Sequence, residues 1–386
     1  MNSFRYYNPV RVYFGENAVS KLKRELPKYG EKVLLTYGGG SIKRNGIYDA
    51  VRQTLLEAGK KVFELSGIMP NPRTEKVYEG IEICKRERID LILAVGGGSV
   101  IDCTKAIAIG SKTEKDFWDA FFVKHEKPTV ALPFGVVLTV AATGSERDNI
   151  AVITNWAEKA KVAYGHELLY AQFAILDPTY TYSLPQEQLI YGSVDILSHV
   201  FEVYFSRDDK NNVSDDLAEA VMKNIMANLN VALENPRDYV ARSNLMWDSS
   251  LAISGLLSLG KETDWQAHEI EHAMSALFDI PHGAGLAVVH PNYLQYICKK
   301  APEKFARYAV NIWHISPAGK TTEKLALEGI EATRQYFRGI GAPTTLGEVG
   351  IQEADIERIA EKTLLVRGSY AQMNVDDIKK ILKMCL

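Results

Sequence analysis

The sequence lacks the features that mark several large classes of protein. Its four cysteines, Cys84, Cys103, Cys298 and Cys385, form no C-x-x-C pair, so a zinc finger or a disulfide framework has little support. We expect them to be reduced and mostly buried. The net charge is −3 and no dense basic stripe is present, which disfavours nucleic acid as a partner.

Long apolar runs are also missing. The opening six residues lack the charged-then-apolar layout of a signal peptide. The longest apolar stretch, 129–143, is too short to span a bilayer and contains Pro133 and Gly135. We therefore predict a cytoplasmic protein with no membrane partner, and we interpret 129–143 as a buried strand that runs into a loop.

What is present suffices for two domains: 386 residues, of which 46% are apolar and 24% charged. In the first half, short β-branched runs alternate with helix-period segments. Strands are expected at 33–36, 61–65 and 91–95, and helices near 46–58, 73–88 and 99–109. This alternation is typical of βαβ units, which form a parallel sheet covered on both faces.

The later part of the chain changes character. A hairpin is expected from strands at 150–154 and 161–164, and a last strand at 174–178. Beyond Pro185 only helical patterns remain. We predict an α/β domain at 1–183 and an all-helical domain at 184–386, with a ligand in the cleft between them.

Two glycine loops each follow an expected strand and precede an expected helix. They are Gly-Gly-Gly-Ser at 38–41 and again at 96–99. Glycine lets the backbone approach a phosphate, and a helix N-terminus offers free N–H groups there. Neither loop is G-x-G-x-x-G, and tight turns or a capping box at Ser99-x-x-Asp102 are the alternatives. Because two such loops occur, we favour phosphate binding.

Histidines and one carboxylate cluster in two windows of the second half. Asp195 and His199 are four residues apart in an expected helix, so they share one face. His268, His272 and His282 follow in the second window. Nitrogen ligands with a carboxylate suit Fe²⁺ or Zn²⁺, and spacing alone includes His272 among the ligands.

The second window also matches H-E-x-x-H at 268–272, the motif of zinc proteases, with Glu269 as general base. A metzincin requires a third histidine six residues after the second, whereas His282 comes ten residues after His272. A metallohydrolase would also leave the glycine loops and the Asp195–His199 pair without a role. It is kept as an alternative.

Taken in order, these segments resemble the iron-containing (group III) alcohol dehydrogenases, which have the dehydroquinate synthase-like fold. The butanol dehydrogenase and broad-range aldehyde reductase branch is the most similar. The resemblance covers essentially the whole chain. It rests on the segments 37–43, 67–72, 96–102, 143–146, 176–178, 195–199 and 264–290.

The resemblance implies a dinucleotide-binding α/β domain and a metal-binding catalytic helical domain. It implies the metal ligands Asp195, His199, His268 and His282. His272 is then not a ligand but a proton relay near the nicotinamide, and Asp102 is the other implied catalytic residue. The implied cofactor contacts are Gly39, Gly40, Ser41, Asn71, Gly97, Gly98, Ser99, Asp102, Thr139, Thr143 and Lys161.

A small alcohol or aldehyde is the implied substrate and a homodimer the implied assembly. The same fold also hosts cyclases that use nicotinamide without net redox change. Those bind acidic, phosphorylated substrates, whereas Asp264, Glu269 and Glu271 flank the expected ligands here. A binding protein without activity would not need four intact ligand positions.

Two local features concern the cofactor. After Thr-Gly-Ser-Glu the family usually has a hydrophobic residue, Asn and Gly, whereas this chain has Arg147, Asp148 and Asn149. The segment 38–44 contains no acid that could accept from a ribose 2′-OH, and Lys43 and Arg44 add positive charge. We therefore predict a preference for NADP(H) over NAD(H). The alternative is that these two side chains are solvated and point away.

Overall fold

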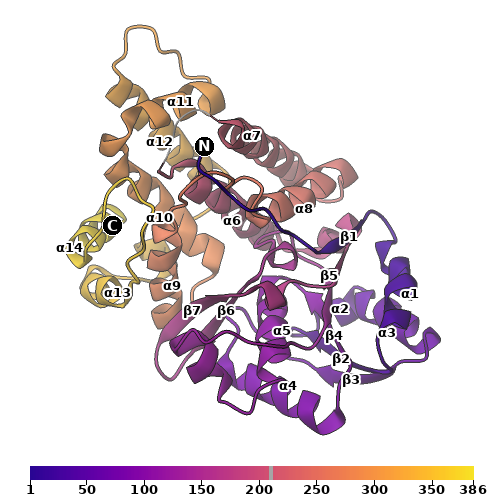
Figure 1. The fold of residues 1–386 in the computed structure, drawn as a ribbon. Coiled ribbons are helices and arrows are strands. Elements are labelled where there is room, and N and C mark those ends of the chain that lie inside the picture. The colour runs from indigo at the N-terminus through magenta and orange to yellow at the C-terminus, as the bar shows by residue number, and fades with distance from the viewer. Residues whose placement is uncertain (208–211) are drawn as a thin grey trace. The chain divides into compact units, whose positions relative to one another are not determined.

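The computed structural model describes residues 1–207 and 212–386. The chain forms two compact units (Figure 1). The helical unit comprises residues 1–6, 185–235 and 251–386, and the α/β unit comprises 7–184 and 236–250. The predicted domain limits, 1–183 and 184–386, remain a proposal. The units differ from them mainly in the two segments 1–6 and 236–250.

The α/β unit is built on a six-stranded sheet in which all pairs are parallel, in the order β1-β8-β5-β4-β2-β3. The strands are β1 (Arg11–Phe14), β2 (Lys32–Tyr37), β3 (Lys61–Leu65), β4 (Leu91–Gly96), β5 (Phe134–Leu138) and β8 (Phe173–Leu176). Every residue of the central strands β4 and β5 is buried. A strand that is covered on both faces does not need alternating polar and apolar residues. This explains why β4 and β5 are continuous apolar runs.

A separate antiparallel hairpin, β6 (Ile150–Asn155) and β7 (Ala160–Gly165), confirms the predicted pair. The predicted strands at 33–36, 61–65 and 91–95 are confirmed, and β5 lies within 129–143. Strand β1 was not predicted. It has four residues at the sheet edge, none of them fully buried, and so it lacks the apolar signal of the inner strands.

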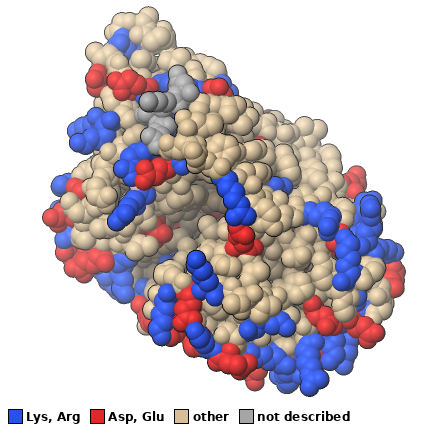
Figure 2. All heavy atoms as spheres, viewed as in Figure 1, with Lys and Arg blue, Asp and Glu red and all other residues tan. Residues whose placement is uncertain are grey.

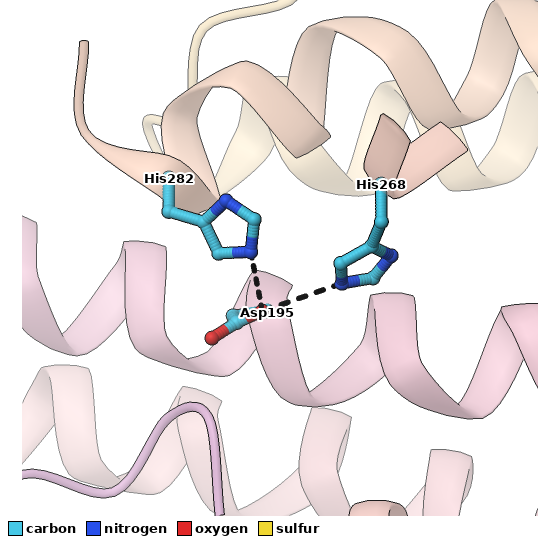
Figure 3. A group of neighbouring side chains, drawn as sticks. All are labelled: Asp195, His268 and His282. Atoms are coloured by element: carbon cyan, nitrogen blue, oxygen red, sulfur yellow. Dashed lines mark ion pairs between the residues drawn. The ribbon is translucent and has the colours of Figure 1, made fainter. Parts of the chain in front are cut away.

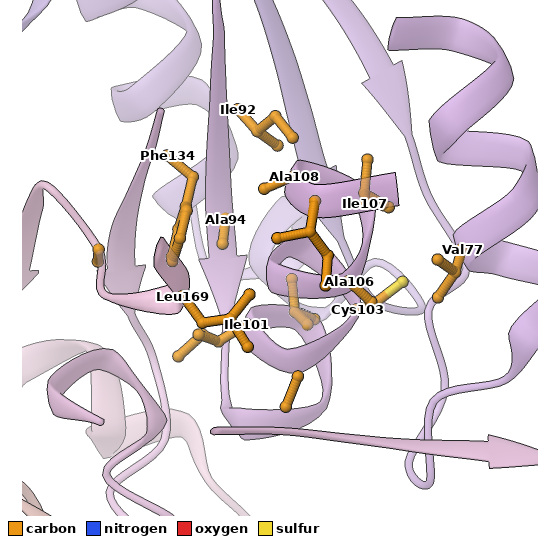
Figure 4. Packing of buried hydrophobic residues seen from close by; sticks show 14 of the residues in the cluster. Val77, Ile92, Ala94, Ile101, Cys103, Ala106, Ile107, Ala108, Phe134 and Leu169 are labelled. Atoms are coloured by element: carbon orange, nitrogen blue, oxygen red, sulfur yellow. The ribbon is translucent and has the colours of Figure 1, made fainter. Parts of the chain in front are cut away.

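The helices of the α/β unit are α1 (Leu22–Glu25), α2 (Ser41–Arg44), α3 (Ile47–Glu57), α4 (Thr74–Glu87) and α5 (Gly98–Gly110). Figure 4 shows Ile101 and Ala106 of α5 in the apolar core with Ile92 of β4 and Phe134 of β5. Gly80 permits close packing of α4 on α5, because a Cβ there would lie 2.3 Å from a methyl group of Ile107. This packing fixes the N-terminus of α5 at the end of β4.

Helix α8 (Tyr239–Ile253) contributes most of its length to the α/β unit, although it lies in the predicted helical domain. Met246 belongs to the apolar core of that unit. The ring of Trp247 lies 5.9 Å from that of Phe14 in an edge contact, and the Ser250 hydroxyl donates to Glu146. These contacts join residues more than a hundred positions apart, so local sequence patterns do not reveal them.

The helical unit has no strand among its described residues, which confirms the predicted all-helical half. Its helices are α6 (Gln186–Tyr204), α7 (Val213–Glu234), α9 (Gln266–Phe278), α10 (His282–Ile297), α11 (Pro302–Trp313), α12 (Thr322–Gly339), α13 (Ile356–Lys362) and α14 (Val375–Met384). Between α9 and α10 the chain turns at Asp279, which has a φ of 55°. Gly283 then lies against α6, where a Cβ would stand 2.1 Å from the Tyr191 carbonyl oxygen. This close approach sets His282 beside α6.

Three general expectations can be compared with the structure. All four cysteines are free and buried, as predicted. On the face shown in Figure 2, basic side chains are interspersed with acidic ones. None of the described helices combines the length and the hydropathy that crossing a bilayer requires.

Candidate active site

Three helices of the helical unit converge on one carboxylate oxygen. Asp195 and His199 lie one turn apart on α6, His268 lies in the first turn of α9, and His282 begins α10. The Nε2 atoms of the three imidazoles lie 3.5, 3.9 and 3.6 Å from Asp195 Oδ1, in the order His199, His268 and His282. Figure 3 shows His268 and His282 both directed at Asp195. The structure thus brings together all four predicted ligands.

Asp195, His268 and His282 offer ligand atoms that all lie within 4.8 Å of one another, and His199 Nε2 lies 3.5 Å from Asp195 Oδ1, distances close to those around a divalent cation. Ligands at about 2.1 Å from a tetrahedral metal lie roughly 3.4 Å from one another. Asp195 Oδ1 and His268 Nε2 are buried and have no hydrogen-bond partner among the described residues. An unsatisfied buried polar atom costs about 1–3 kcal/mol, and a cation among the four side chains would remove that cost.

Glu202, one α6 turn beyond His199, orients His268. Its Oε1 accepts from the backbone N–H of His268 at 3.0 Å and lies 2.9 Å from the Nδ1 of the same ring. A proton on Nδ1 leaves the Nε2 lone pair free for a metal. Burial, with neighbouring imidazoles, holds the pKa of His268 well below its usual range, which favours the neutral form that ligates.

Burial also raises the pKa of the Glu202 carboxyl well above its usual range. A cation bound at Asp195 would oppose that rise, because its charge stabilises the nearby carboxylate.

Glu271 orients His282 in the same way. Its Oε2 contacts His282 Nδ1, and its Oε1 accepts from the Ser275 hydroxyl. Glu271 is fully buried. Thus, of the two glutamates in the H-E-x-x-H segment, Glu271 contacts a predicted ligand, whereas Glu269 lies 3.7 Å from His272 Nδ1.

The sequence analysis missed the roles of Glu202 and Glu271, although it carried a signal for each. Glu202 follows Asp195 by seven residues and His199 by three, so it lies on the same helix face. Glu271 follows His268 by three residues on α9. A helix face that carries ligands and then a buried acid is typical of a metal site with oriented histidines.

His272 lies beside the cluster. Its ring centre is 6.4 Å from that of His268 and 5.7 Å from that of His282. Its side chain is largely buried, with 7% of the residue exposed. The three imidazoles gathered at Asp195 are those of His199, His268 and His282, whereas the ligand atoms of His272 group with those of Glu271 and His282, within 4.8 Å of one another.

In the α/β unit the two glycine loops lie at neighbouring strand ends. Strands β2 and β4 pair side by side, with Tyr37 opposite Val95, and each loop begins at the carboxyl end of its strand. Thr139 follows β5, and its backbone N–H donates to the Gly96 carbonyl at 3.1 Å. Ligands collect at this edge of a parallel sheet.

The hairpin carries Lys161 toward the same loops. Lys161 pairs with Thr154, whose backbone N–H donates to the Pro72 carbonyl at 2.8 Å. Asn71, the preceding residue, is buried with a φ of 51°. Thr154 of β6 therefore lies between Lys161 and the segment that carries Asn71.

The glycines differ in what they require. At Gly98 a Cβ would lie 2.4 Å from Thr143 Oγ1, so packing alone demands glycine. Gly40 has a φ of +99°, which favours glycine. At Gly39 a Cβ would meet nothing within 4 Å, and no positive φ is imposed. A ligand that approaches the backbone would explain this glycine, so the loop fits a dinucleotide phosphate.

Asp102 lies in the second turn of α5 and is buried. Its Oδ1 accepts from the Ser145 hydroxyl at 2.5 Å and its Oδ2 from the Val152 N–H at 3.0 Å. Burial raises the pKa of its carboxyl to about 6. These two hydrogen bonds hold the side chain of Asp102 against Ser145 and strand β6 of the hairpin.

Comparison with known proteins agrees with this geometry. A family model described as iron-containing alcohol dehydrogenase matches residues 9–178. A model for the C-terminal part of the Fe-containing alcohol dehydrogenase family matches residues 189–386.

Individual relatives span almost the whole chain. NADH-dependent butanol dehydrogenase A of Clostridium acetobutylicum is 45% identical over 99% of both chains. NADPH-dependent aldehyde reductase YqhD of Escherichia coli is 34% identical over 94% of this chain and 93% of its own. The crystal structure of NADH-dependent butanol dehydrogenase A from Thermotoga maritima superposes with a TM-score of 0.96 at 39% identity, covering 100% of this chain and 99% of that one.

The resemblance inferred from the motifs is thereby confirmed, and neither a metallohydrolase nor a cyclase is favoured. The chain belongs to the iron-containing alcohol dehydrogenase family, in its butanol dehydrogenase and aldehyde reductase branch, and is a metal-dependent oxidoreductase of alcohols and aldehydes.

Proposed function

We propose that this protein moves a hydride between a nicotinamide dinucleotide and a small primary alcohol or aldehyde of the butanol type. The convergence of three imidazole Nε2 atoms on Asp195 Oδ1 carries this proposal. The butanol dehydrogenase and aldehyde reductase names of relatives covering nearly the full chain support the substrate class.

In this proposal Asp195, His199, His268 and His282 hold one divalent ion, Fe²⁺ or Zn²⁺. Three neutral imidazoles and one carboxylate leave such an ion with a net charge of +1. When bound, the metal supplies Lewis-acid polarisation of the alcohol or carbonyl oxygen. Glu202 and Glu271 keep two ligand rings oriented, so that little reorganisation is needed on binding.

His272 is the proposed proton relay. It lies next to His282 without joining the group around Asp195. A histidine in this place can pass a proton to or from the substrate oxygen. Glu269 Oε2 lies 3.7 Å from the Nδ1 of His272.

The dinucleotide is proposed to bind the α/β unit at the two glycine loops. The unrestrained Gly39 and the N-terminus of α5 would meet its phosphates. The proposed contacts are Gly39, Gly40, Ser41, Asn71, Gly97, Gly98, Ser99, Asp102, Thr139, Thr143 and Lys161. Asp102 is also the proposed second catalytic residue.

Within this site we propose NADP(H) as the preferred cofactor. The loop 38–44 contains no acid, and Lys43 lies over the rings of Tyr37 and Tyr48, at 5.0 and 4.6 Å. Its ammonium is thus held at the end of β2. The names of the Clostridium and Bacillus relatives specify NADH and that of the Escherichia coli reductase NADPH. Membership of the family therefore does not determine the cofactor, and the proposal rests on the residues of the loop 38–44.

The preference is tested by the ratio of kcat/KM with NADPH to that with NADH. We expect a ratio above one, and we expect Gly39→Asp to lower the NADPH value because a carboxylate repels a 2′-phosphate. A wild-type enzyme that prefers NADH, or an unchanged NADPH value in Gly39→Asp, contradicts the preference.

The function is tested by oxidation of reduced cofactor with butanal and a panel of shorter and longer aldehydes, after metal analysis. We expect stoichiometric alcohol formation that requires one bound divalent ion per chain. Peptide hydrolysis without cofactor turnover, or cofactor cycling without net oxidation, would overturn the proposal. Sedimentation of the same sample tests the proposed homodimer.

A further inference from the structure

Asp148, where the family usually has asparagine, forms an ion pair inside the α/β unit. Its carboxylate contacts the ammonium of Lys105 on α5. The Lys105 side chain is fully buried and also donates to Ser145 Oγ at 2.8 Å and to the Ile150 carbonyl at 2.7 Å. Asparagine at this position would leave the buried ammonium without this counter-charge.

The same lysine is connected to Asp102. Ser145 Oγ accepts from Lys105 and donates to Asp102 Oδ1. Two carboxylates therefore share one buried cation, and the group as a whole carries one negative charge. The two partners act oppositely on the pKa of the Asp102 carboxyl, which Lys105 lowers and Asp148 raises.

The neighbouring Arg147, the other charged departure, is directed at a side chain of α8. Its guanidinium carbon lies 5.7 Å from the ring centre of Trp247 on α8. The charged side chains with the largest effect on the pKa of the Asp102 carboxyl are Lys105 and Asp148. Of the two added charges, the carboxylate of Asp148 therefore has the larger effect on the proposed cofactor contact Asp102.

We propose that Asp148 biases the cofactor site toward the oxidised dinucleotide over the reduced one. The oxidised nicotinamide ring carries a positive charge and the reduced ring is neutral. The pyrophosphate and adenosine are identical in both forms, so their repulsion by Asp148 cancels in the ratio of affinities. The inference rests on the proposed binding of the dinucleotide at the glycine loops and Asp102.

Removal of one charge near a partly buried site changes such a ratio by about three- to tenfold. The test uses the full-length, metal-loaded protein without alcohol or aldehyde. The Kd of the reduced cofactor is measured by its fluorescence, and that of the oxidised cofactor by displacement of the reduced one. In D148N, which keeps the side-chain shape, we expect Kd(reduced)/Kd(oxidised) to fall by roughly three- to tenfold.

Two further variants make the test specific. K105M/D148N removes both charges of the pair, so its ratio should stay near that of the wild type. Asp90→Asn removes an acid just before β4. The glycine loop lies at the other end of that strand, about 20 Å away, so this variant should leave the ratio unchanged. Thermal unfolding establishes that each variant is folded.

The outcomes separate the inference from the proposed function. An unchanged ratio in D148N, or an equal change in D90N, overturns the inference while dinucleotide binding stands. A wild-type protein that binds neither form overturns the proposed function and the inference with it. If D148N does not fold, K105M and K105M/D148N provide the same comparison, because they differ only in the charge at position 148.

Discussion

The two units prepare their ligand sites by different means. In the helical unit, side chains from α6, α9 and α10 converge, and buried glutamates orient two of the rings. In the α/β unit, the proposed site is largely backbone at the ends of β2 and β4, with open space beside Gly39 and Gly40. A metal needs a few donors at fixed distances, whereas a phosphate needs several N–H groups and close approach.

This difference determines which substitutions matter in each unit. In the helical unit, removing a ligand atom or the acid that orients it should weaken metal binding. In the α/β unit, adding a single carbon to a glycine should weaken cofactor binding or disturb the packing. The following changes separate the two kinds of site, beginning with the largest expected effect.

His268→Ala removes a proposed ligand, whereas His272→Ala removes an imidazole beside the cluster. We expect His268→Ala to lose the metal and roughly a thousandfold or more in kcat, because Lewis-acid assistance contributes several kcal/mol. His272→Ala should keep the metal and turn over more slowly. Elemental analysis and circular dichroism provide the measurement, and equal metal loss in both variants would show that the ligand assignment is wrong.

Glu202→Gln and Glu271→Gln keep the ligands but weaken their orientation. Loss of such an orienting carboxylate typically costs 10- to 100-fold in metal affinity, and we expect that range in chelator competition. Glu269→Gln is the matched control on α9, since its carboxylate is 3.7 Å from the non-ligand His272.

The Glu269→Gln variant also tests the hydrolase alternative. A hydrolase of the H-E-x-x-H type depends on Glu269 as general base, so near-total loss of aldehyde reduction in Glu269→Gln would count against the assignment made here. A mild change, with metal content retained, is expected.

Gly39→Ala and Gly98→Ala add the same methyl group to the two glycine loops. At Gly39 nothing lies within 4 Å, so stability should be unchanged, while cofactor Kd rises by about tenfold if the dinucleotide backbone contact is lost. At Gly98 the new carbon would lie 2.4 Å from Thr143 Oγ1, and overpacking of about 1–3 kcal/mol should lower Tm. A lowered Tm in Gly39→Ala, or unaltered cofactor binding there, would contradict the proposed role of this loop.

Much of each unit was predictable because its signals are local. β-branched runs marked β2, β3 and β4, and helical periodicity marked α3, α4 and α5. The four-residue spacing of Asp195 and His199 indicated half of the metal cluster, because that spacing always places two residues on one helix face. The resemblance to a known family was needed to separate His272 from the ligands.

The sequence by itself determined the inner strands and the helices between them, the two glycine loops and the residue types that bind a metal. Tertiary structure decided that Glu202 orients His268 across two helices, that α8 packs on the α/β core, and that Asp148 meets Lys105. The physical reason is that periodicity relates residues within one element, where backbone geometry is fixed. Contacts between elements depend on which faces bury the most apolar surface together, and that choice is made by the whole chain.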